Sequence, residues 1–70
     1  MREILRESDP IRIGLLVAIL REAGIAPIVL DAATSGLLGG DSAVPMRLVV
    51  ADAEFAEALR VLREAGEMPG

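Results

Sequence analysis

The alternation of apolar and polar residues divides the chain into five elements. Apolar residues recur at helical spacing over 10–23 and 53–65, which predicts one amphipathic helix in each segment. Shorter runs rich in Ile, Leu and Val lie at 3–5, 25–31 and 46–50, and these runs predict strands. The predicted order of elements is therefore β-α-β-β-α.

Both predicted helices have recognisable ends. Asp9 and Pro10 are typical of a helix start, because an Asp side chain accepts hydrogen bonds from first-turn amides and proline has no amide to satisfy. The second helix is expected to begin with Asp52 as its cap. Both segments end in the letters LREAG, which place Gly24 and Gly66 as helix stops. The repeat is either a trace of a duplicated strand–helix unit or a common helix ending that arose twice, and both histories give the same order of elements.

This order matches the first five elements of the ferredoxin-like sandwich, an α+β fold. Pro27 supports the match, because proline is confined mostly to edge strands and the second strand is an edge in the ferredoxin-like order 4-1-3-2. Only four residues follow Gly66. We therefore expect a single domain over residues 1–70, a ferredoxin-like β-α-β-β-α sandwich with a three-stranded antiparallel sheet, two helices on one face and a fourth strand absent or vestigial.

The two predicted helices differ in how much of their surface is apolar. The second has one apolar stripe and a charged outer face. The first has an inner row and, on another side, a second row, and a helix that is apolar around most of its girth is normally covered on all sides. The cover could be the chain's own 32–44 segment, a second copy or a different protein. The second row is the candidate interface of a homodimer, and its members are Ile11, Leu15 and Ile19. The expected core-facing residues are Ile13, Leu16, Val17, Leu20 and Ala23 from the first helix and Phe55, Ala58, Leu59 and Leu62 from the second.

Composition removes several classes of function. The chain has no Cys and no His, so thiolate sites, the usual zinc ligands and His-based catalysis lack their groups, and we expect neither a metal nor another cofactor. The formal net charge is −4 and no basic run is present, so nucleic acid is not an expected partner. The longest apolar run, at 13–20, is short of the roughly 20 residues that cross a bilayer, and the first residues lack a secretory signal. These features indicate a cytoplasmic protein that has no membrane partner.

Several short motifs, in this order and spacing, resemble a bacterial family described as putative prokaryotic signal-transducing proteins. They are SDP at 8–10, LREAGI at 20–25, VLD at 29–31, Pro45, and RLVVAD at 47–52. The resemblance spans nearly the whole chain. It implies a ferredoxin-like fold grouped with the PII nitrogen-regulatory proteins, a regulatory or binding role, and no assigned catalysis.

The long segment between the second and third strands is the other candidate site. This segment, residues 32–44, is thirteen residues long, whereas the loop of a β-hairpin usually has about 2–5 residues. The resemblance implies a partner-contacting loop at this position, as in PII-like proteins. Its glycines could turn amides toward an anion and its hydroxyls could add donors, whereas an acidic residue among them would repel a phosphate. The candidate ligand or partner residues are Asp31, Thr34, Ser35, Gly36, Gly39, Gly40, Asp41 and Ser42.

The predicted function follows from these two surfaces. No nucleophile with a neighbouring base is indicated, so we do not expect an enzyme. We expect a regulatory or signal-transducing binding module that makes protein–protein or small-effector contacts through the 32–44 loop and the first helix. The alternative is a structural accessory subunit, or a homo-oligomerisation domain, with no ligand.

Overall fold

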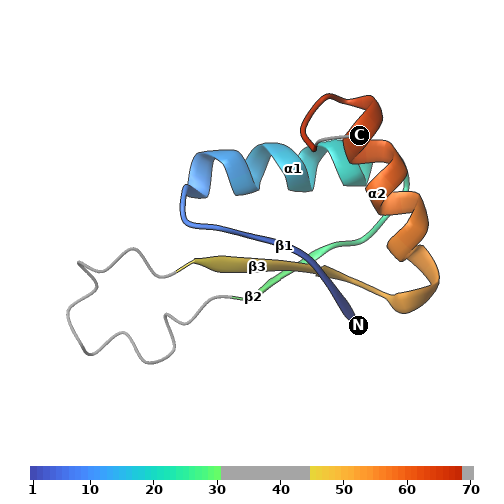
Figure 1. The fold of residues 1–70 in the computed structure, drawn as a ribbon, viewed down its shortest axis with the longest axis horizontal. Coiled ribbons are helices and arrows are strands. Elements are labelled where there is room, and N and C mark those ends of the chain that lie inside the picture. The colour runs from blue at the N-terminus through green and yellow to red at the C-terminus, as the bar shows by residue number, and fades with distance from the viewer. Residues whose placement is uncertain (31–44, 69–70) are drawn as a thin grey trace.

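The computed structural model describes residues 1–30 and 45–68. Its elements follow the predicted order β-α-β-β-α (Figure 1). The second helix is preceded by a short 3₁₀ turn, η2. The bounds of the elements are β1 Arg2–Glu7, α1 Pro10–Glu22, β2 Ile28–Leu30, β3 Met46–Val50, η2 Asp52–Glu54 and α2 Phe55–Glu64.

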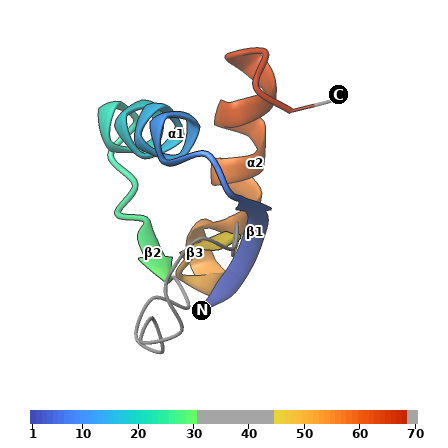
Figure 2. The same cartoon turned by 90° about the vertical axis from the view of Figure 1, so that its left-hand side faces the viewer.

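The three strands form one antiparallel sheet with the order β1-β3-β2. Both helices lie on the same side of this sheet (Figure 2). β1 runs from Arg2 opposite Val50 to Glu7 opposite Met46, with an irregularity in the register at Ile4. The predicted α+β sandwich and its strand order are confirmed, and residues 1–30 and 45–68 contain no fourth strand.

The repeated letters LREAG form the same helix ending twice. In each copy the glycine amide donates to the arginine carbonyl oxygen at 3.0 Å. The amide of the next residue, Ile25 or Glu67, donates to the leucine carbonyl oxygen at 2.9 Å. This is the Schellman pattern, which requires a left-handed residue after the helix. Gly24 and Gly66 supply it, with φ of +84° and +78°. The repeat therefore encodes a way of ending a helix.

The second strand is shorter than predicted, and the reason lies in this helix ending. Ile25 was expected to begin the strand, but its amide is used to close α1. Its side chain is buried in the core. Pro27 has no amide to donate to a ladder, so pairing starts only at Ile28. The prediction that β2 is an edge strand is confirmed.

The core lies between the sheet and the two helices. It is aliphatic and contains no buried polar side chain among the described residues. Of the predicted core residues, Val17 and Phe55 are only partly buried but pack against the core cluster. Leu59 is partly buried outside that group, and Ala23, the C-cap residue of α1, is exposed. The residues of the buried cluster are Ile13, Leu16, Leu20, Ile25, Leu48, Val50, Ala58 and Leu62.

Asp52 does not cap α2, and that prediction is wrong. Ala51 stands at the cap of η2, and no side chain bonds to the first amides there. Because the chain enters α2 through a 3₁₀ turn, Asp52 lies outside the α-helix, and its Oδ1 lies 2.9 Å from the amino-terminal nitrogen of Met1. The hydrogen bond from that ammonium group, and then its charge, hold the pKa of Asp52 below its ordinary value.

Candidate functional site

The start of α1 is fixed by the residues that the sequence singled out. Asp9 is the N-cap, and its Oδ1 accepts a hydrogen bond from the Ile11 amide at 2.9 Å. Pro10 is the first helical residue. The Glu7 carboxylate accepts a hydrogen bond from the Asp9 amide at 3.2 Å. These contacts tie the helix to the end of β1 and thereby set which side of α1 faces the sheet.

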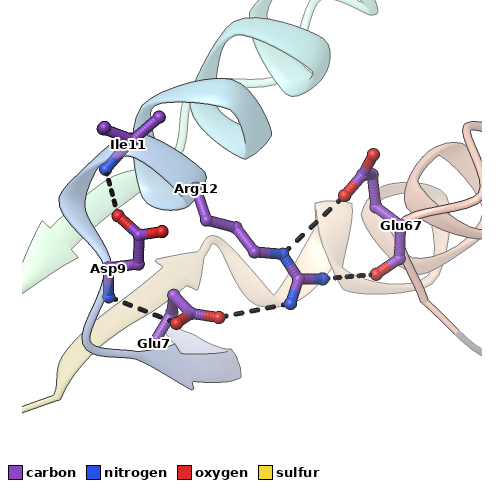
Figure 3. A network of polar contacts seen from close by, with 5 residues as sticks. All are labelled: Glu7, Asp9, Ile11, Arg12 and Glu67. Carbon is purple, nitrogen blue, oxygen red and sulfur yellow. Dashed lines mark hydrogen bonds and ion pairs between the residues drawn. The ribbon is translucent and has the colours of Figure 1, made fainter.

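Arg12 joins this helix start to the end of α2 (Figure 3). Its guanidinium donates to Glu7 Oε1 at 3.2 Å and to the Glu67 carbonyl oxygen at 2.7 Å. Its Nε also lies 3.7 Å from Glu67 Oε1. The cluster connects the neighbouring end of β1 and start of α1 to a residue 55 positions further along the chain. Because Arg12 and Glu7 satisfy each other and the backbone, the cluster fits a structural role.

The exposed side of α1 is apolar from Ile11 to Ala18, and exposed Arg21 and Glu22 follow in its last turn. Ile11 is 82% exposed and Leu15 is 48% exposed. Gly14 and Ala18 are exposed as well. The four follow the spacing i, i+3, i+4 and i+7, which places them on one side of a helix. We call this surface the α1 face, and it consists of Ile11, Gly14, Leu15 and Ala18.

The third residue of the predicted interface, Ile19, lies elsewhere. Its side chain is partly buried and packs against the core cluster. The structure therefore brings Ile11 and Leu15 together on an open surface and separates Ile19 from them. Gly14 and Ala18 were not among the predicted interface residues, because small side chains contribute little to a hydrophobic pattern. The signal that could have found them is the unbroken spacing from Ile11 to Ala18.

The sheet has a second apolar surface on the side away from the helices. Ile28 and Leu30 of the edge strand are 47% and 41% exposed. They lie opposite Val49 and Arg47 of β3. Val29, between Ile28 and Leu30 in β2, is partly buried and packs against the core cluster, so this strand carries apolar residues on both faces. This surface is smaller and more mixed than the α1 face, because the exposed Arg47 interrupts it.

The other predicted site cannot be placed. Its residues, Asp31, Thr34, Ser35, Gly36, Gly39, Gly40, Asp41 and Ser42, lie outside the described residues. The contribution of this segment to a ligand or partner site stays a prediction.

The charged groups of α2 form a network of their own. The Arg60 guanidinium lies 2.7 Å from Glu57 Oε2 and 3.0 Å from Glu64 Oε2, which confirms the predicted charged outer face. Within residues 1–30 and 45–68, no group of three or more acidic side chains is placed to hold a metal ion. Across the same residues, neither helix has the length and apolar character that crossing a bilayer demands.

The fold and the α1 face define a small α+β sandwich that carries an open apolar surface on its first helix. The chain belongs to the family described as putative prokaryotic signal transducing protein, whose sequence profile matches residues 1–66. The resemblance seen in the sequence is therefore confirmed. Comparison with curated proteins and with solved structures gave no match.

Proposed function

We propose that the chain is a cytoplasmic, non-enzymatic regulatory protein that acts in signal transduction by binding a protein through the α1 face. The observation that carries the proposal is the exposure of Ile11, at 82%, beside Leu15, at 48%, on a helix whose opposite side forms the core. Contact with a partner would remove this apolar area from water, at about 25 cal/mol per Å². Family membership supports the signalling role.

The choice of a binding role over catalysis rests on the chemistry of the described side chains. The charged groups nearest the α1 face, Glu7, Asp9 and Arg12, are engaged in holding the helix start. The side chains of the α1 face itself are apolar, so this surface offers contact area but no group for proton transfer. The activity that such a surface supports is recognition of another apolar surface.

Photo-crosslinking tests this proposal in living cells. A photoreactive amino acid replaces Ile11 in one version of the chain and Ala56, an exposed residue of α2, in the matched control. Irradiation should yield protein adducts at position 11 well above those at position 56, because only the α1 face is covered by a partner. Equal adduct formation at the two positions would refute the proposed binding surface, whatever the identity of the partner.

A further inference from the structure

Nothing in residues 1–30 and 45–68 explains why Gly14 is glycine. It lies inside α1, where glycine costs about 1 kcal/mol relative to alanine. A Cβ placed on Gly14 would meet no atom of the described part of the chain within 4 Å, and the φ of Gly14 is not positive. Neither packing nor backbone conformation therefore requires glycine here. Glycine also permits close approach of another backbone or side chain from outside.

The α1 face matches a reversed copy of itself. If two α1 helices pack antiparallel about a two-fold axis between positions 14 and 15, Ile11 lies opposite Ala18 and Leu15 lies opposite Gly14. Every large side chain then meets a small one. A parallel pair would instead place Ile11 on Ile11 and leave Gly14 facing Gly14. Two-fold symmetry requires a self-complementary patch of this kind.

The helix dipole of α1 favours the same arrangement. Exposed Asp9 lies at the beginning of the helix and exposed Arg21 lies in its last turn. In this register Arg21 of one copy lies opposite Ser8, beside Asp9 of the other, and exposed Glu22 comes to the same helix start, so the end charges partly cancel. Antiparallel packing opposes the two helix dipoles, whereas a parallel pair would place like charges and like dipole ends together.

From this complementarity we propose that the occupant of the α1 face is a second copy of the chain, bound as an antiparallel α1–α1 pair. This inference rests on the proposed function, which is protein binding through the α1 face, because it identifies the bound protein as a second copy of the chain. Standard interfaces bury about 1,200–2,000 Å². A single pair of helices of this length covers less, so the dimer is expected to be reversible and to dissociate on dilution.

Disulfide trapping tests both the contact and its direction. The natural chain has no Cys, so an introduced Cys is the only thiol. The variants Ile11→Cys and Ala18→Cys are mixed in equal amounts and oxidised by air. Mass spectrometry then separates the three disulfide-linked dimers by mass. We expect the mixed 11–18 dimer to exceed the share that random pairing gives, because only that pair of positions is opposed in the proposed register.

Other results of this experiment overturn the inference. Excess of the 11–11 and 18–18 dimers would show parallel packing. Crosslinking no faster than that of Ala56→Cys on α2 would show that α1 faces do not meet. The photo-crosslinking experiment separates the two proposals, since an adduct at position 11 with a protein other than this chain would sustain the proposed function and refute self-association.

Sedimentation of folded variants gives a second, independent test. Gly14→Gln fills the space opposite Leu15, and we expect it to weaken the dimer at least about tenfold. Arg21→Glu should also weaken it, whereas Arg63→Glu, the equivalent position in the second LREAG copy, should not. Circular dichroism checks that each variant is folded. An unchanged dimer in Gly14→Gln, or equal effects of the two arginine variants, would contradict the inference.

Discussion

Gly14 lies within α1 and Gly24 follows the end of the same helix. Only the backbone conformation of Gly24 requires a glycine. Gly24 and Gly66 have positive φ, a conformation that costs an ordinary residue about 1–2 kcal/mol. Gly14 has a helical backbone and free space around its missing Cβ. The left-handed backbone therefore explains glycine at positions 24 and 66, but it does not explain glycine at position 14.

This difference predicts opposite effects of one substitution. Gly24→Ala and Gly66→Ala should each lower the free energy of unfolding by about 1–2 kcal/mol, because alanine strains the left-handed conformation. Gly14→Ala should raise it by up to about 1 kcal/mol, because alanine favours the helix. Urea unfolding of dilute protein measures all three. Destabilisation by Gly14→Ala would reveal an intramolecular contact that the structure lacks.

At the scale of elements, the two helices begin in different ways although both are preceded by an aspartate. Asp9 bonds directly to an amide of the first turn of α1. Asp52 reaches the amino terminus instead, while η2 leads into α2 without a side-chain cap. The sequence shows the same residue type before both helices. The geometry of the preceding chain decides which of them can reach an amide.

Substitution of the two aspartates should separate these roles. Asp9→Ala should lower the free energy of unfolding by about 1 kcal/mol, as expected for loss of an N-cap. Asp52→Ala should cost less, because its partner is an exposed terminal amine. Denaturant unfolding at neutral pH gives both values. If Asp52→Ala lowered the free energy of unfolding as much as Asp9→Ala or more, Asp52 would have to act as a helix cap after all.

The lowered pKa of Asp52 also gives its contribution a definite pH dependence. A carboxyl whose pKa is lower in the folded state stabilises the fold above its unfolded pKa, and this contribution is lost as pH falls through the lowered value. The unfolding free energy of the natural chain should therefore approach that of Asp52→Ala in acid.

The elements themselves were largely predictable from local signals. The order β-α-β-β-α, the start of α1 at Pro10 and the strand at Met46–Val50 follow from spacing, capping residues and strand propensity. The start of β2 did not follow, because Ile25 satisfies the helix ending before it can join a strand. Competition of two elements for one amide is not visible in either element's own pattern.

At the scale of the whole molecule, stability rests on a few aliphatic side chains. A chain of this length has a total stability of about 4–10 kcal/mol. Fully buried residues such as Leu16, Leu48 and Leu62 bring the sheet and both helices together. Each of them therefore contributes a large share of the total.

Truncation of one of these leucines should bring the molecule close to unfolding. Leu62→Ala should cost about 2–5 kcal/mol, because it removes apolar contacts and leaves a cavity. Leu30→Ala is the matched control, since Leu30 is 41% exposed and lies outside the core cluster. Urea titration of both variants measures the difference. Similar losses would show that the far face of the sheet is covered in solution.

The sequence by itself determined the class of the fold, the repeated helix ending and the family, because capping, turn and periodicity signals act between residues close together in the chain. Only the tertiary structure decided which apolar residues of α1 remain open. Ile19 and Leu15 lie one turn apart and share the same chemistry, yet Ile19 packs against the core cluster and Leu15 remains exposed. Burial depends on what packs from elsewhere in the chain, and that information is not local to either residue.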